Sequence, residues 1–164
     1  MLSYPDGTFV PIAIATHGLV GLTLGVLLFE RPWAGLLGGL FADGDFLFPE
    51  RLGQAFVHRS FTHSFLLLGV LAGVAAIVDY RTEGSLARRT GGAVAVAYLS
   101  HLAIDTTTPQ GVQFFWPLVP EKIHLDPGIG SHAAIVTVVF WVVCLGALTI
   151  RGSDVVTLPS PNWE

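Results

Sequence analysis

Residues 61–78 have the sequence FTHSFLLLGVLAGVAAIV and contain no Asp, Glu, Lys or Arg. A helix needs about 17 to 25 mostly apolar residues to cross the hydrocarbon core of a bilayer, so this stretch is long enough to span one. Four further apolar stretches flank it in the chain: Pro11–Phe29, Trp33–Phe48, Gly91–Thr108 and His132–Ile150. The sequence therefore predicts an all-α fold, a polytopic transmembrane bundle of about five helices.

The composition supports this fold class. Of the 164 residues, 52% are hydrophobic and 12% are charged, and the mean hydropathy is +0.65. A soluble domain carries about 25% charged residues. Twelve acidic against eight basic residues leave no basic patch for phosphates, which argues against a nucleic-acid partner. The single cysteine, Cys144, excludes an intramolecular disulfide and a Cys-rich zinc site.

The second stretch, Trp33–Phe48, differs from the others because it is short and contains Asp43 and Asp45. We expect this helix to be short or re-entrant. Residues 1–151 are predicted to form one transmembrane domain, followed by a polar C-terminal tail at residues 152–164.

Small residues recur inside the apolar stretches. Gly21 with Gly25, and Gly69 with Gly73, each form a GxxxG pattern. Because small residues let helix backbones approach closely in lipid, both pairs predict close helix packing.

If all five helices cross, the chain gathers its histidines at one end of the bundle. The N-terminus and the loops 49–60 and 109–131 then lie on the same side of the membrane. All six histidines fall in these loops or in the adjoining halves of the helices, and so do three carboxylates: His17, His58, His63, His101, His124, His132, Asp43, Asp45 and Asp105. An Asp at the centre of a membrane helix costs about 2.5 to 3.5 kcal/mol, so such groups persist where they pair, bind an ion or line a cavity. We predict one shared polar site near one leaflet.

The spacing within these segments is compatible with metal binding. His101 and Asp105 are four residues apart and share one helix face. Asp43 and Asp45 would point about 200° apart on an α-helix, so we expect the helix to end there, with Gly44 permitting a turn.

Around the next helix start, Ser60 is the predicted N-cap. His58 would then precede the helix, and His63 would lie in its first turn.

Four motifs together resemble a known family: Thr16-His17, Ala42-Asp43-Gly44-Asp45, His58-Arg59-Ser60-Phe61-Thr62-His63-Ser64, and Leu99-Ser100-His101 through Asp105-Thr106-Thr107-Thr108-Pro109-Gln110-Gly111-Val112. They are similar to the YdjM-type family of inner-membrane, metal-dependent hydrolases, from about His17 to Pro117. The family often has Pro before its first Asp and Asp-Ile-Asp between the carboxylates, where this chain has Ala42 and Gly44. The His/Asp site also has a more distant similarity to the helical, zinc-dependent phospholipase C and P1 nuclease proteins.

The candidate ligands are nitrogen and oxygen donors: His17, Asp43, His63, His101 and Asp105. Such a set suits a divalent metal, with zinc the first choice and manganese or iron behind it. The number of groups allows one or two ions.

The remaining site residues are assigned supporting roles. Asp45 and His58 are predicted as further ligands or as the catalytic base, and Arg59 as a cation that stabilises charge in the transition state. Thr62, Ser64 and Thr108 are predicted to orient ligands or cap helices, and His124 and His132 to be interfacial.

These residues suggest a membrane-embedded hydrolase that acts on a phosphoester or other ester of an amphipathic, lipid-like substrate through a metal-activated water. The alternative is a small transporter or channel with a His/Asp metal or proton site. Because the opposite halves of the helices hold almost no polar residues, a one-sided site is favoured over a conduit.

The expected location is a prokaryotic cytoplasmic membrane, with the lipid bilayer and the substrate as partners. Basic residues are more frequent at the end opposite the histidines. That end has Arg31, Arg81, Arg88, Arg89 and Arg151, and the histidine end has Arg51, Arg59 and Lys122. The positive-inside rule then places the site on the extracytoplasmic side.

Overall fold

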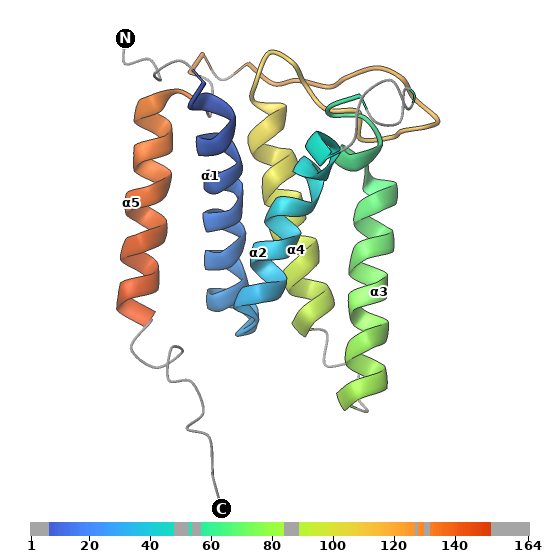
Figure 1. The fold of residues 1–164 in the computed structure, drawn as a ribbon, viewed down its shortest axis with the longest axis vertical. Coiled ribbons are helices and arrows are strands. Elements are labelled where there is room, and N and C mark those ends of the chain that lie inside the picture. The colour runs from blue at the N-terminus through green and yellow to red at the C-terminus, as the bar shows by residue number, and fades with distance from the viewer. Residues whose placement is uncertain are drawn as a thin grey trace, which may run out of the picture.

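The computed structural model describes residues 7–47, 53, 57–83, 89–126, 128–129 and 132–151. The described chain forms an up-and-down bundle (Figure 1) of five α-helices: α1 Phe9–Leu24, α2 Pro32–Leu40, α3 Phe65–Glu83, α4 Arg89–Thr106 and α5 Ala134–Arg151. The predicted all-α bundle is therefore confirmed. The predicted polar tail at 152–164 lies outside the described residues.

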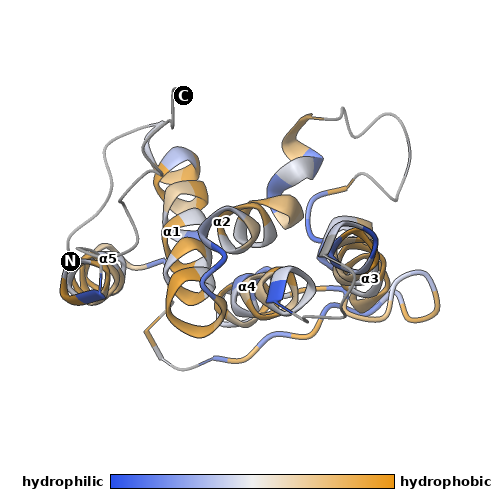
Figure 2. Cartoon of the chain, turned by 90° about the horizontal axis from the view of Figure 1, so that it is seen from below, coloured by the Kyte–Doolittle hydropathy of each residue, from blue (hydrophilic) through white to orange (hydrophobic). Residues whose placement is uncertain are grey.

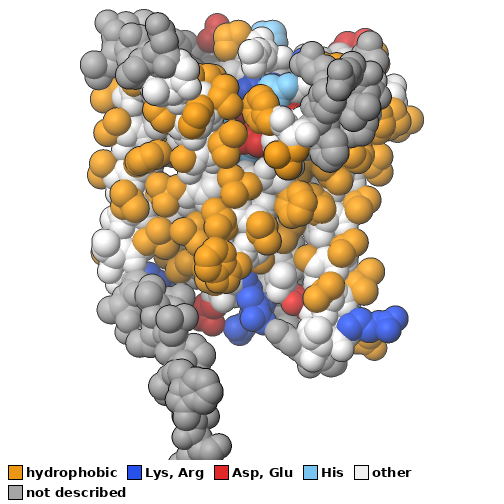
Figure 3. Space-filling view, viewed as in Figure 1, with side chains coloured by type: hydrophobic (Ala, Val, Ile, Leu, Met, Phe, Trp, Pro, Cys, Tyr) orange, Lys and Arg blue, Asp and Glu red, His pale blue; other side chains and the backbone are white. Residues whose placement is uncertain are grey.

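Among the described residues, three helical segments are long and apolar enough to cross a membrane: Phe9–Phe29, Phe65–Thr82 and Ala134–Arg151. The first of these consists of α1 and the π-helical turn Gly25–Phe29 that extends it. α3 and α5 bury little of their surface inside the protein, and their outward faces are apolar. Figure 3 shows this broad apolar band between the two ends of the molecule, as expected for a surface that contacts lipid tails.

The second helix is short, as predicted. α2 has nine residues and continues as a 3-10 helix, Phe41–Leu47. Together these two segments reach at most about 27 Å, close to the roughly 30 Å of a hydrocarbon core. Because of this reach, the chain returns to the end where α1 begins, and the predicted alternation of helices is maintained (Figure 1).

α4 is the central helix of the bundle, in contact with α1, α2 and α3 (Figure 2). Ala93, Ala97, Tyr98 and Leu102 on this helix are almost completely buried. Surrounding helices rather than lipid cover most of α4, which is why it tolerates the polar side chains of the site.

The glycines of α1 and α2 form the closest helix contact. A Cβ atom on Gly21 would lie 2.4 Å from the Gly35 carbonyl oxygen, and one on Gly25 would lie 2.8 Å from the Gly35 Cα. The predicted role of this first GxxxG pair in helix packing is confirmed.

Within the described part of the chain, the second GxxxG pair does not pack against another helix, so that prediction was wrong. A Cβ atom on Gly69 or Gly73 would meet no atom within 4 Å. α3 approaches α4 through a different face, where Ala72 and Ala76 lie against Gly91.

The N-cap of α3 is also one turn later than predicted. Ser60 precedes only a short 3-10 helix, Phe61–His63, and its side chain makes no capping hydrogen bond. Ser64 instead accepts a hydrogen bond from the Leu67 backbone N–H at 3.2 Å. His63 therefore lies before the long helix rather than in its first turn.

Candidate metal centre

The predicted site residues meet at one end of the bundle, the upper end in Figure 1. His17 comes from α1, and His101 and Asp105 from the last turns of α4. Asp43 and Asp45 lie on the 3-10 helix after α2. His58 and Arg59 precede α3 as a turn, and His63 ends the short helix that follows them. Segments far apart in the sequence thus contribute to one cluster.

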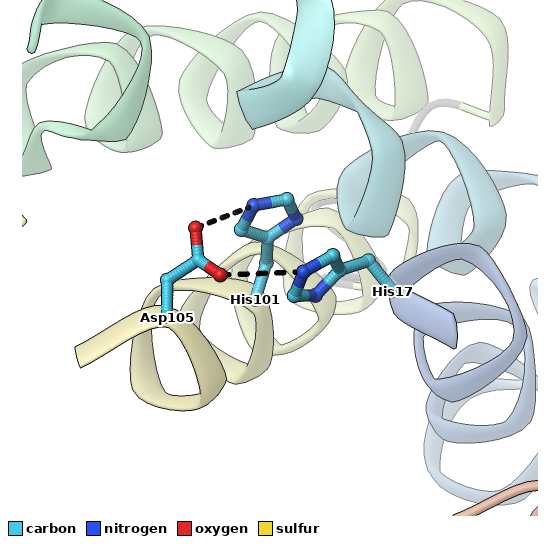
Figure 4. Close-up of side chains that lie close together, drawn as sticks. All are labelled: His17, His101 and Asp105. Carbon is cyan, nitrogen blue, oxygen red and sulfur yellow. Dashed lines mark ion pairs between the residues drawn. The ribbon is translucent and has the colours of Figure 1, made fainter. Parts of the chain in front are cut away.

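The first group of candidate ligands consists of His17, His101 and Asp105, all buried, with ligand atoms within 4.8 Å of one another. The distance from His17 Nε2 to Asp105 Oδ1 is 3.4 Å, and from His101 Nε2 to Asp105 Oδ2 it is 3.5 Å (Figure 4). Ligands about 2.0–2.1 Å from a tetrahedral ion lie roughly 3.3 Å from each other. The spacing in this group therefore fits ligands that share an ion.

A second group, Asp43, His58 and His63, meets the same criterion. It adjoins the first group at two points. His63 Nε2 lies 3.2 Å from Asp105 Oδ2, and His101 Nε2 lies 3.7 Å from Asp43 Oδ1. The two groups form one continuous cluster.

Asp45 contacts both histidines of this second group. Its Oδ2 atom lies 3.0 Å from His58 Nδ1, accepts a hydrogen bond from Thr62 at 2.8 Å, and is 3.6 Å from His63 Nδ1. Asp45 therefore orients two imidazoles. Thr62, one of the predicted orienting residues, contacts both Asp45 and His63.

His63 and His101 are oriented as metal ligands usually are, with one ring nitrogen bonded to the protein and the other left for the ion. His63 Nδ1 contacts the Thr62 hydroxyl at 3.0 Å. His101 Nδ1 donates to the Gly39 carbonyl at 2.7 Å, so its lone pair is on Nε2. Five buried atoms of the described cluster have no hydrogen-bond partner: His17 Nδ1 and Asp45 Oδ1, and the candidate ligand atoms His63 Nε2, His101 Nε2 and Asp43 Oδ2. Leaving a buried polar group unpaired costs about 1 to 3 kcal/mol, so the convergence of the candidate ligand atoms favours a bound ion.

Arg59 is a buried member of the cluster. Its Nη2 lies 3.2 Å from Asp105 Oδ1, and its Nη1 donates to Thr108. Its backbone φ of 68° is in the left-handed region, which is uncommon for a residue other than glycine. The Arg59 N–H donates to Asp45 Oδ2 at 3.3 Å, and the Arg59 carbonyl accepts from the Gln113 N–H, which holds this conformation.

Gly44 does not have the expected role. α2 ends at Leu40, before the two aspartates, as predicted. However, Gly44 lies inside the 3-10 helix and is not among the residues with positive φ. The tighter 3-10 winding, rather than a glycine turn, sends Asp43 toward His101 and Asp45 toward His58.

His132 is a site residue that the sequence interpretation missed. Its Nε2 lies 3.2 Å from Asp105 Oδ1, and its ring packs against Phe9. It was predicted to be interfacial, as was His124. His124 is exposed and lines a separate pocket with Thr107 and Asp126. The position of His132 at the start of the last apolar stretch, at the same end as the other histidines, was the available signal.

A cavity of about 290 Å³ gives access to the cluster. One part of its wall is polar and includes His17, Asp43, His58, Arg59, Asp105 and His132. An apolar part comes mainly from the first turns of α1, with Phe46 added from the 3-10 helix after α2: Phe9, Val10, Ala13, Ile14 and Phe46. Figure 3 shows histidine and acidic side chains among the apolar ones at this end.

The charges of the cluster do not balance. Asp43, Asp45 and Asp105 carry three negative charges when ionised, and Arg59 supplies one positive charge. Lys122 donates to the His58 carbonyl at 3.2 Å, and partial burial, with Arg59 nearby, lowers the pKa of its amine. Even with the Lys122 charge counted, one negative charge remains in excess. Buried charge is costly unless it is compensated, so the excess negative charge favours a divalent cation.

The fold and the site define an integral membrane helical protein with a buried His/Asp cluster that could hold a metal ion. The chain belongs to the YdjM inner membrane protein family, whose profile matches residues 12–160. The predicted membership of the YdjM family and the predicted location in a prokaryotic cytoplasmic membrane are therefore confirmed. The hydrolase activity and the distant similarity to phospholipase C and P1 nuclease proteins stay predictions.

Two relatives show the extent of this similarity. The inner membrane protein YbcI of Escherichia coli (strain K12) is 29% identical over 120 residues, which cover 66% of this chain and 69% of YbcI. The inner membrane protein YdjM of the same organism is 40% identical over 82 residues, which cover 43% of this chain. The match spans 40% of the length of YdjM. No solved structure matches this chain.

Proposed function

We propose that this protein is a membrane-embedded, metal-dependent hydrolase that cleaves a phosphoester or other ester of an amphipathic substrate. The observation that carries the proposal is the buried group His17, His101 and Asp105, whose ligand atoms converge beside a cavity at one end of the bundle. Zinc is the preferred metal because the ligands are imidazoles and carboxylates, and manganese or iron are the alternatives.

A divalent ion held there would polarise the ester and lower the pKa of a bound water to about 7. A side chain near the ion then has to accept the proton that this water loses. His58 and His132 are the two imidazoles at the cavity wall that are partly exposed. Each is oriented by a carboxylate, His58 by Asp45 and His132 by Asp105. Asp45, which is buried, acts through His58 rather than on the substrate.

Arg59 would bind the anionic part of the substrate. Its guanidinium lines the cavity while remaining paired with Asp105. An arginine suits phosphate or carboxylate because its planar fork can donate two parallel hydrogen bonds. This geometry favours a phosphoester.

The apolar wall of the cavity supports an amphipathic substrate. Phe9 and Val10 are 45% and 41% exposed, and with Ala13 they border the polar part of the cavity. An acyl chain lying on this wall would remain in an apolar environment while its polar head reached the histidines. A fully water-soluble substrate would gain nothing from such a wall.

The alternative function, a transporter or channel, needs a polar path to the other end of the bundle. Among the described residues, the buried polar side chains toward that end are Thr23 and Asp79. The Thr23 hydroxyl donates to the Leu19 carbonyl in its own helix, and Asp79 accepts from the Thr90 N–H at the start of α4. Both are used in local structure, which favours a site open at one end.

The test is hydrolysis by the purified full chain in detergent micelles, loaded with zinc or manganese. We expect release of product from at least one member of a panel of phospholipids and lipid phosphodiesters, and loss of that activity together with the metal in His101→Ala. His124→Ala is the matched control and should retain both. A metal-loaded protein that cleaves nothing in the panel would contradict the proposal, and metal or proton flux into liposomes would favour the transporter.

A further inference from the structure

The cluster contains more ligands than one ion uses. A tetrahedral ion with an open position takes three protein ligands. The structure provides two such sets, the first formed by His17, His101 and Asp105, and the second by Asp43, His58 and His63. A single ion would leave one of these sets without a metal.

The Asp105 carboxylate lies between the two sets. Its Oδ1 atom is 3.4 Å from His17 Nε2, in the first set. Its Oδ2 atom is 3.5 Å from His101 Nε2 and 3.2 Å from His63 Nε2. One carboxylate therefore faces imidazoles of both sets, as a bridging carboxylate does.

Both sets contain buried ligand atoms that have no hydrogen-bond partner. His101 Nε2, in the first set, has no hydrogen-bond partner, and neither do His63 Nε2 and Asp43 Oδ2, in the second. His63 and His101 are completely buried, and their ring centroids are 5.1 Å apart. Each set thus has at least one unsatisfied ligand atom. An ion in the first set alone would leave His63 Nε2 and Asp43 Oδ2 of the second set unsatisfied.

The side-chain charges alone account for one ion, and a second ion would have to be balanced by an anionic ligand. With three ionised carboxylates and one guanidinium, the cluster has a net charge of −2 when its histidines are neutral. One divalent ion would neutralise it, and two would give a net charge of +2. A positive pocket would attract an anionic phosphoester and stabilise the charge that develops on its oxygens.

We propose that the site binds two divalent ions side by side, one in each set, with Asp105 as the shared ligand. This inference deepens the proposed function and rests on the metal site assigned there. Two-metal sites with ions about 3.5–4 Å apart are typical of enzymes that cleave phosphate esters, so the substrate class is narrowed to a phosphoester. His58 is then a ligand, and His132 becomes the proton acceptor at the cavity wall.

The test is metal counting and magnetic resonance on the full chain in detergent. After equilibration with Mn²⁺ and removal of free metal, we expect two ions per chain and an electron paramagnetic resonance spectrum of two exchange-coupled ions. This measurement on the wild-type protein needs no substitution. One ion per chain, or two ions with an uncoupled spectrum, would overturn the proposal.

Variants test the assignment of each set. Asp43→Asn should leave one ion, bound by the first set, and His17→Ala should leave one ion, bound by the second. Both should show an uncoupled spectrum, while His124→Ala should keep two coupled ions. Loss of both ions in Asp43→Asn, with the helical circular dichroism spectrum unchanged, would mean a single site.

The outcome is separable from that of the proposed function. Two coupled ions without cleavage of any phosphoester would sustain the two-metal site and refute the hydrolase. One ion per chain together with cleavage of a phosphoester would sustain the hydrolase and refute the two-metal site.

Discussion

Asp105 is the residue on which the site is centred. It lies 3.2–3.5 Å from four imidazoles and from the Arg59 guanidinium. The i,i+4 spacing of His101 and Asp105 was visible in the sequence and correctly placed both side chains on one face. The contacts of Asp105 with His63 and His132 were not visible, because they depend on how loops bring distant segments together.

At this scale we predict that His132→Ala lowers the turnover number about 100-fold, the lower range for loss of a general acid or base. Metal content should stay unchanged, because His132 is outside both sets of ligands. Steady-state kinetics with parallel metal analysis would check this. His124→Ala, which removes an exposed histidine from the same loop region, is the control. Equal effects of the two substitutions would contradict the assignment.

A second residue-scale prediction concerns Asp45. Asp45→Asn should weaken metal binding about 10- to 100-fold, the usual effect of losing a carboxylate that orients a ligating histidine. The physical reason is that an amide can present its N–H₂ rather than an oxygen to His58 Nδ1, 3.0 Å away. Competition with a chelator of known affinity measures the change. Unchanged affinity would show that Asp45 does not orient the ligands.

At the scale of elements, the contact between α1 and α2 determines the geometry of the site. Gly39 of α2 approaches so closely that a Cβ atom there would lie 2.4 Å from the His17 carbonyl oxygen. The same glycine accepts the hydrogen bond from His101 Nδ1. Close packing of these two helices thus holds His17 and His101 together, with their rings stacked at 3.7 Å.

The two GxxxG pairs offer a matched comparison of helix packing. Gly21→Ala should destabilise the protein by about 1 to 3 kcal/mol, the usual cost of overpacking, because its Cβ would lie 2.4 Å from a backbone oxygen. Gly69→Ala should leave stability unchanged or raise it slightly, since nothing lies within 4 Å and alanine favours helices. Thermal unfolding in one detergent compares them, and equal midpoints would contradict this account.

The two GxxxG pairs show which features of the fold the apolar pattern can predict and which it cannot. Hydropathy and length identified the five helices because every backbone group in lipid must be paired within its own segment. Neither GxxxG pattern says which face of a helix meets a neighbour. That depends on the whole bundle, so the sequence alone could not distinguish Gly21 from Gly69.

At the scale of the whole molecule, the two ends differ in chemistry. One end contains the His/Asp cluster and the other contains arginines, among them Arg31, Arg81, Arg89 and Arg151; the fifth, Arg88, lies outside the described residues. Arg89 and Arg151 both pair with Glu30 at the opposite end from the cluster. This asymmetry follows directly from the alternation of helices and was predictable once the five helices were identified.

The orientation prediction applies to the whole molecule. By the positive-inside rule, the arginine end should face the cytoplasm and the site should face outward. In a Cys144→Ser background, Leu118→Cys at the site end should react with a membrane-impermeant maleimide in intact spheroplasts. Glu30→Cys at the other end should react only after the membrane is opened. The reverse labelling pattern would contradict the prediction.

The central claim is that imidazoles and carboxylates from separate helices hold a metal ion in one buried cluster. Anomalous X-ray scattering from crystals of the zinc-loaded protein tests it most directly. We predict an anomalous peak about 2.0–2.1 Å from His17 Nε2 and His101 Nε2 and in contact with Asp105, the distances of zinc–imidazole bonds. A zinc-loaded crystal with no peak among these side chains, or with zinc bound only at an exposed position such as His124, would contradict the account.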